Sequence, residues 1–201
     1  EQQRFELFAA CNDDIERGVK DNGAVGLPKY AVLGDSVQAQ TRAPALADTQ
    51  YVRWLYATHC GEKFSTVLSS GRLGDALATA PEVLVLGLGS NNFSENWQIS
   101  PALFGPAVAS FNQIMDQSSG VPCRVLINLP ERAPDYFDAA TQAQWLSLIR
   151  QLNQVYANAE ATRPGVHVAD WRLLTALFPG LVYDDEHLTR AGINVRINLA
   201  V

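Results

Sequence analysis

The stretch Tyr30-Ala31-Val32-Leu33-Gly34-Asp35-Ser36-Val37 decides the predicted fold. Its first four residues have strand propensity, the Gly-Asp-Ser corner ends the strand, and a helix-competent segment follows over 38–48. Such a strand-to-helix corner leaves Ser36 at the carboxyl edge of a parallel sheet, where open α/β folds place their ligands. Free N–H groups at the helix start would favour negative charge there. The same tripeptide is an ordinary turn and N-cap sequence, so alone it does not establish a site.

The composition indicates a single globular chain with a substantial core. The chain has 201 residues, of which 47% are hydrophobic and 18% charged. With 21 acidic and 15 basic residues the net charge is −6, and no basic stripe is present, so we expect no nucleic-acid partner. No segment is apolar for long enough to span a membrane.

Three cysteines are too few and too far apart for a zinc site or a disulfide framework. One bridge and one buried thiol are compatible with this count, and Cys11–Cys60 is the pair to test. Cys123 would then be the remaining thiol.

Turn residues divide the chain into an N-terminal extension over 1–29 and a main domain over 30–201. Apolar residues among charges predict an amphipathic helix over 2–20. Asp21-Asn22-Gly23 and Gly26-Leu27-Pro28 break this pattern. We therefore expect an appended helix and linker that lie outside the main sheet.

The main domain alternates strand and helix patterns with short connections. Strands are predicted at 30–35, 63–69, 82–88, 124–129 and 166–170, and helices at 37–59, 72–79, 101–116, 141–162 and after His187. This alternation predicts a three-layer α/β/α fold. Its five-stranded parallel sheet is expected in the flavodoxin-like order 2-1-3-4-5.

Two further motifs follow predicted strands or lie near the C-terminus. Gly87-Leu88-Gly89-Ser90-Asn91-Asn92 is not a dinucleotide motif, because position 92 is not glycine and the first strand does not precede it. It is either a plain turn or a loop whose asparagine carboxamide donates to an oxyanion. In Asp184-Asp185-Glu186-His187, Asp184 could hold one imidazole nitrogen so that the other acts as a base. An exposed acidic loop is the alternative. His59 and His167 are weaker candidates.

Serine, asparagine and histidine thus follow separate strand–helix units in one order, and in this the chain resembles the SGNH (GDSL-type) hydrolases over roughly residues 30–200. The resemblance implies that Ser36 is the nucleophile and that Asn91 is an oxyanion donor. It also implies that Asp184 and His187 complete a catalytic triad. The family's second block is a serine or glycine after the second strand whose N–H completes the oxyanion hole. Ser69-Ser70-Gly71 is similar to this block, with Ser70 and Gly71 as the two alternatives.

The sequence departs from the family pattern at two positions. Val37 stands where leucine is frequent, and Asn92 replaces the usual aspartate, so the hydrogen bonding of that loop is altered. The short spacing between the second and third blocks more loosely resembles the SGNH domains of bacterial cell-wall and polysaccharide O-acetyltransferases. So does the stretch from Val168 to Trp171.

The resemblance implies a serine mechanism without metal or cofactor. Ser36 Oγ attacks an ester carbonyl, His187 takes the proton, and Asp184 fixes the imidazole. The oxyanion would be held by the N–H of Ser36, the N–H of Ser70 or Gly71, and the Asn91 side chain. Asp35 is expected to be structural.

Three functions are compatible with these residues. The first is an esterase that removes small acyl groups, above all acetyl, from a carbohydrate or other small ester. The second is the catalytic domain of an O-acyltransferase, with the N-terminal helix as a tether to a membrane acyltransferase domain. The third, a non-catalytic carbohydrate-binding module, has no use for a full triad. Candidate sugar-stacking faces are Trp97, Tyr136 and Trp171, although such tryptophans are more often core residues. The family favours a periplasmic or extracellular location.

Overall fold

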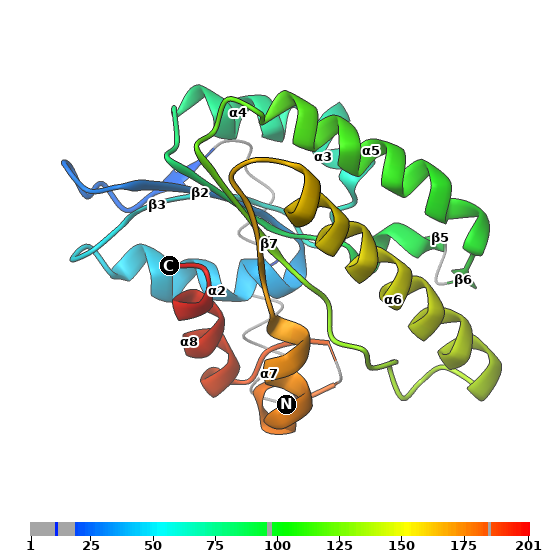
Figure 1. The fold of residues 1–201 in the computed structure, drawn as a ribbon. Coiled ribbons are helices and arrows are strands. Elements are labelled where there is room, and N and C mark those ends of the chain that lie inside the picture. The colour runs from blue at the N-terminus through cyan, green and yellow to red at the C-terminus, as the bar shows by residue number, and fades with distance from the viewer. Residues whose placement is uncertain (1–10, 12–18, 96–97, 185) are drawn as a thin grey trace.

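The computed structural model describes Cys11 and residues 19–95, 98–184 and 186–201, and these form a three-layer α/β/α arrangement (Figure 1). In this part of the chain the main sheet has the order β1-β3-β2-β4-β7-β8. From β3 to β8 all neighbours are parallel, which confirms the predicted order 2-1-3-4-5. The strands are β1 (Lys20–Asp21), β2 (Lys29–Gly34), β3 (Arg53–Thr58), β4 (Val83–Gly87), β7 (Cys123–Ile127) and β8 (Val166–Ala169).

The N-terminal extension contributes an edge strand to this sheet. β1 pairs antiparallel with β3. The sequence placed residues 20 and 21 outside the main sheet, and for these two residues that expectation was wrong. Most of the predicted helix over 2–20 lies outside the described residues. No helix in the described ranges is long and apolar enough to cross a membrane.

The second strand was predicted wrongly. The helix α2 (Ser36–Ala47) ends well before His59, and β3 follows at Arg53–Thr58. Residues 64–69, predicted as a strand, form the helix α3 (Phe64–Ser69). In α3, Phe64 and Val67 lie three residues apart on the buried face of a helix, so their β-preferring side chains misled the prediction. The aromatic residues Trp54 and Tyr56 mark the true strand.

Helices cover both faces of the sheet, and alternate strand residues point into two cores. In β2, Ala31 and Leu33 belong to one core and Val32 to the other. Each fully buried Val or Leu side chain contributes about 1.5–3 kcal/mol. One face carries α3, α4 (Arg72–Ala78), α5 (Phe104–Gln117) and α6 (Ala139–Thr162), and the other carries α2 (Ser36–Ala47), α7 (Trp171–Leu177) and α8 (Arg190–Leu199) (Figure 1).

Short elements complete the connections between these layers. They are the 3-10 turns η2 (Ser90–Phe93), η3 (Pro101–Leu103) and η4 (Pro179–Leu181) and the small hairpin of β5 (Ser94–Glu95) and β6 (Gln98–Ile99). The turn η2 directly follows the loop at the end of β4, and α8 begins just after the C-terminal histidine motif. Both sequence motifs therefore lie at the carboxyl edge of the sheet.

Gly34 lets α2 begin directly against the end of the sheet. A Cβ at this position would lie 2.1 Å from Gln38 Cβ and 3.1 Å from the Gly87 carbonyl oxygen. Such distances are well inside van der Waals contact, so only glycine fits without a shift of the helix or of β4. The glycine of the Gly-Asp-Ser corner is therefore a packing requirement as well as a turn residue.

We predict that Gly34→Ala lowers the free energy of unfolding by about 1–3 kcal/mol, because the added methyl group overpacks the start of α2. Gly74→Ala, in α4, is the matched control, since a Cβ there meets nothing within 4 Å. This control should gain about 0.5–1 kcal/mol from helix propensity. Urea unfolding of both variants measures the difference, and an unchanged Gly34→Ala midpoint would contradict the prediction.

Candidate active site

Ser36 is the first residue of α2, at the carboxyl end of β2. Asp35 caps this helix: it has extended backbone angles, and its side chain accepts the Val37 N–H at 3.1 Å. Because Ser36 is in the first helical turn, its own N–H has no partner inside the helix. The corner thus presents a hydroxyl and a free N–H group at the same edge of the sheet.

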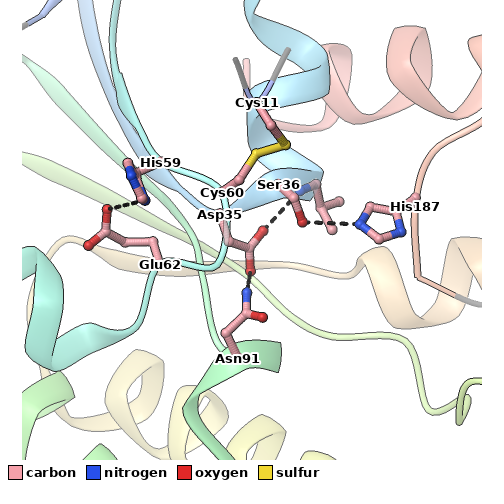
Figure 2. Close-up of a disulfide and its surroundings, with 9 residues drawn as sticks. Cys11, Asp35, Ser36, His59, Cys60, Glu62, Asn91 and His187 are labelled. Atoms are coloured by element: carbon pink, nitrogen blue, oxygen red, sulfur yellow. Dashed lines mark hydrogen bonds and ion pairs between the residues drawn. A yellow bond between two sulfur atoms is a disulfide. The ribbon is translucent and has the colours of Figure 1, made fainter. Parts of the chain in front are cut away.

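His187 joins Ser36 to Asp184. Its Nε2 lies 3.1 Å from Ser36 Oγ, and its Nδ1 lies 2.8 Å from Asp184 Oδ2 (Figure 2). An ionised carboxylate only accepts hydrogen bonds, so Nδ1–H donates to Asp184 and Nε2 is left to accept the serine hydroxyl. Asp184 Oδ1 also accepts the His187 backbone N–H at 2.6 Å. The structure therefore brings all three predicted triad residues together.

Gln40 connects the helix of the serine to the loop of the histidine. Its Oε1 accepts the Leu188 N–H at 2.9 Å, and its Nε2 donates to the Leu188 carbonyl at 3.3 Å. Gln40 is buried, so both hydrogen bonds are shielded from water. This pair fixes the residue after His187 relative to α2, and the sequence motifs gave no signal for it.

Opposing effects set the pKa of His187. Burial lowers it, but the hydrogen bond that Nδ1–H donates to Asp184 and the charges of Glu186, Asp184 and Asp35 outweigh burial and raise the pKa above its usual value. For Asp184, burial raises the pKa, and the hydrogen bonds to His187 more than offset this, so its pKa is lowered. The pair therefore stabilises an imidazolium beside a carboxylate, as a general base requires.

Asn91 and Ser90 converge on the carboxylate of Asp35. Ser90 Oγ donates to Asp35 Oδ2 at 3.1 Å, and Asn91 Nδ2 donates to the same oxygen at 3.3 Å. The Asn91 amide has two hydrogens, so this contact orients the carboxamide and leaves one hydrogen for another acceptor. Asp35 is buried, which raises its pKa to about 6, with the charge of Glu186 adding to the effect. Figure 2 places Asp35 between Ser36 and Asn91.

Ser70 and Gly71 do not follow the second strand. They lie between α3 and α4, because the strand predicted before them is a helix. The loop after the true second strand, β3, comprises residues 59–62 and contains Gly61 with a φ of +74°. The reason for selecting Ser70 and Gly71 was therefore wrong, and Gly61 occupies the position described for the second block. An aromatic strand followed by His59-Cys60-Gly61 was the signal in the sequence.

The loop 59–62, hereafter the β3 loop, begins beside the serine corner. Gly34 pairs with Thr58 across β2 and β3, and the His59 N–H donates to the Gly34 carbonyl at 3.0 Å. Ser36 is two residues after Gly34 at the end of β2, and Cys60 is two residues after Thr58 at the end of β3. Neighbouring strands lie about 4.8 Å apart, so the β3 loop and Ser36 share one edge of the site.

Asn92 ties the start of α3 to the loop after β4. Its Oδ1 accepts the Phe64 N–H at 3.0 Å, and its Nδ2 donates to the Gly89 carbonyl at 3.1 Å. An aspartate at this position could accept the first hydrogen bond but, when ionised, could not donate the second. The asparagine at this position therefore bridges the start of α3 and the loop after β4, which an ionised aspartate could not do with both hydrogen bonds.

The predicted disulfide is confirmed: Cys11 bonds to Cys60, across 49 residues of sequence, and Cys123 is a free, partly exposed thiol. The other two histidines lie outside the triad, His59 within the β3 loop and His167 on β8. Of the predicted stacking faces, Trp171 is fully buried, which excludes it, and Trp97 lies outside the described residues. Tyr136 is 70% exposed and remains a candidate.

Solved structures share this architecture. A lipase/acylhydrolase from Enterococcus faecalis superposes with a TM-score of 0.63 at 18% identity and covers 86% of this chain and 93% of its own. The chain has the SGNH (GDSL-type) hydrolase fold. An acetylxylan esterase from Geobacillus stearothermophilus matches at a TM-score of 0.58 and 13% identity, with 88% and 94% covered. A GDSL-like lipase from Bacteroides thetaiotaomicron matches at a TM-score of 0.62 and 16% identity, and the match covers 89% of this chain and 90% of the lipase. The sequence matches no family model and no curated protein.

We predict that Glu186→Gln lowers the pKa of His187, because it removes a negative charge that stabilises the imidazolium. The pKa can be measured by NMR titration of the imidazole resonances. Glu82→Gln is the matched control, since Glu82 lies just before β4, at the amino edge of the sheet. Equal His187 titration in Glu186→Gln and wild type would contradict the electrostatic description.

Proposed function

We propose that the protein is a serine esterase that removes small acyl groups, chiefly acetyl, from a carbohydrate ester. The observation that carries this proposal is the chain of contacts from Ser36 Oγ to His187 and Asp184, at 3.1 and 2.8 Å. A nucleophile, a base and a carboxylate that orients the base are the minimum for acyl transfer through a covalent intermediate. The structural neighbours, which are described as esterases and lipases, support the same reaction class.

The reaction would follow from this geometry. Ser36 Oγ attacks the ester carbonyl while His187 Nε2 takes the hydroxyl proton, and the proton then passes to the leaving alcohol. In the second half of the reaction, a water molecule attacks the acyl-enzyme while His187 takes its proton. The proton then returns to Ser36 Oγ as the acid is released. The Ser36 N–H, the Asn91 carboxamide and the N–H of Gly61 are the donors available to the oxyanion.

The cavity at this edge favours a small acyl group. Four of its lining residues, Asp35, Val37, Ser90 and Glu186, directly neighbour Ser36, Asn91 or His187 in the sequence. About 20 Å³ of it admits the centre of a water molecule, which is room for a methyl-sized group. Its apolar lining is formed by Val37, Leu129, Pro130, Trp145, Ile149 and Trp171.

Tyr136 supports a carbohydrate as the alcohol side of the substrate. It lies in the loop between β7 and α6, the same loop that contributes Pro130 and Pro134 to the cavity. Its ring is exposed and packs edge-on against Phe137, with centroids 4.7 Å apart. An exposed, supported aromatic face beside a cleft is suited to stacking on a sugar ring.

Transfer to a sugar hydroxyl is the alternative outcome of the same acyl-enzyme. In the second function, an acceptor hydroxyl replaces water, and a membrane acyltransferase domain would supply the acyl group. The disulfide favours a periplasmic or extracellular location for either reaction, because such bonds persist in oxidising compartments. Release of free acetate measured against transfer to an added sugar distinguishes the two.

We predict that the protein hydrolyses p-nitrophenyl acetate and that Ser36→Ala lowers kcat at least about 1,000-fold, because the nucleophile is removed. Butyrate and octanoate esters should react progressively more slowly. Ser119→Ala, an exposed serine after α5, is the matched control and should retain the wild-type rate. An equal rate in wild type and Ser36→Ala would refute the serine mechanism.

We predict that Tyr136→Ala raises KM for an acetylated xylo-oligosaccharide about five- to thirtyfold, the loss of about 1–2 kcal/mol of stacking. Hydrolysis of p-nitrophenyl acetate should change less than twofold, since this ester has no sugar ring. Tyr51→Ala is the control, because Tyr51 is equally exposed, at 71%, but precedes β3 at the opposite edge of the sheet. A uniform loss on both substrates would instead indicate a disturbed active site.

A further inference from the structure

The two residues at the tip of the β3 loop have free N–H groups at the catalytic edge. Among the described residues, the N–H groups of Cys60 and Gly61 donate to no backbone acceptor, whereas those of His59 and Glu62 are both bonded. Gly61 is exposed, so its donor is accessible to a ligand. Unpaired N–H groups beside a nucleophile are the usual components of an oxyanion hole.

The base of the β3 loop is held from both sides. The His59 N–H donates to the Gly34 carbonyl at 3.0 Å, and the Glu62 N–H donates to the His59 carbonyl at 3.1 Å. The buried carboxylate of Glu62 also pairs with Arg72 at 2.9 Å. These contacts define where the loop leaves and rejoins the fold.

Within the described ranges, the tip of the loop has no comparable packing. A Cβ built on Gly61 would meet no atom of the described residues within 4 Å. In this part of the chain, the bond that reaches the tip is the disulfide from Cys60 to Cys11, which Figure 2 draws together with Ser36 and His187. A loop tip without packing adopts several conformations unless another constraint selects one.

We propose that the Cys11–Cys60 disulfide is a positioning element for catalysis, which holds the N–H groups of the β3 loop toward the oxyanion and makes activity sensitive to dithiols. This inference rests on the proposed esterase function and goes beyond it. Two-electron reduction breaks the S–S bond and yields two thiols, while dithiothreitol is oxidised to its cyclic disulfide. The triad itself is unaffected, because Ser36, His187 and Asp184 are held by contacts of α2 and of the loop over 181–189.

The test compares oxidised and reduced protein with p-nitrophenyl acetate. Reduction should lower kcat about ten- to hundredfold with KM within twofold, because an oxyanion donor acts in the transition state. The affinity for methylboronic acid, which forms a tetrahedral adduct with a serine, should fall by a similar factor. Reoxidation should restore both values.

Variants separate this role from a general loss of structure. Cys11→Ser/Cys60→Ser should have the low kcat of reduced protein and no response to dithiothreitol. Cys123→Ser, which removes the free thiol, should keep the wild-type kcat and the full response. Circular dichroism should show that the double variant is folded. NMR titration should show the His187 imidazole titrating as in wild type.

Three results would overturn the inference. The first is a kcat that stays unchanged in protein whose disulfide has been reduced, as confirmed by thiol titration. The second is a double variant that is unfolded at every temperature, because the bond would then support the whole fold instead of the loop. The third is an oxidised wild type that neither hydrolyses the ester nor binds the boronic acid, which would remove the proposed function as well. Hydrolysis that depends on Ser36 but not on the disulfide would remove the inference alone.

Discussion

The buried carboxylate of Asp35 is the constraint on which the site depends. It caps α2 through the Val37 N–H and accepts hydrogen bonds from Ser90 and Asn91. The end of β2 and the loop after β4 are thereby fixed to one charged group. A buried carboxylate is stable only when its oxygens are satisfied, and each lost partner costs about 1–3 kcal/mol. The place of the serine and the orientation of the asparagine carboxamide therefore cannot vary independently.

A second buried polar contact holds α2 against α8. Arg196, buried in α8, donates to Gln38 Oε1 at 3.0 Å and lies over the Trp171 ring at 5.2 Å. Burial lowers the pKa of Arg196 to about 10, so the guanidinium stays charged at neutral pH and partly offsets the charge of Asp35. The helix α8 begins three residues after His187. The contact of Arg196 with Gln38 and the hydrogen bonds of Gln40 with Leu188 therefore hold the segment around His187 against α2, the helix that begins with Ser36.

The sequence predicted those parts of the fold that depend on local patterns. For the cysteines, the sequence only named Cys11–Cys60 as the pair to test, and the structure bonds this pair. The corner at Gly34–Ser36 and the strand order follow from residue types and spacing. So does the meeting of Ser36, Asn91 and His187 at one edge, because parallel strands end on the same side. The second strand was missed because the β-branched residues over 63–69 belong to the short helix α3, which buries Phe64 and Val67 on one face. The ring partner of Phe64, Phe111, is distant in sequence. That single error moved the expected oxyanion loop from Gly61 to Ser70 and Gly71.

The charges around His187 limit the conditions under which it can act as a base. Three carboxylates, those of Asp184, Glu186 and Asp35, stabilise the imidazolium and raise the pKa of His187. The base is available only when the imidazole is neutral, that is, above this raised pKa, so neutral to alkaline pH favours the reaction. In the proposed esterase, the same carboxylates would repel an anionic product such as acetate. The raised pKa of His187 and the repulsion of that product would then have one electrostatic cause, and the proposed activity would fall in acid.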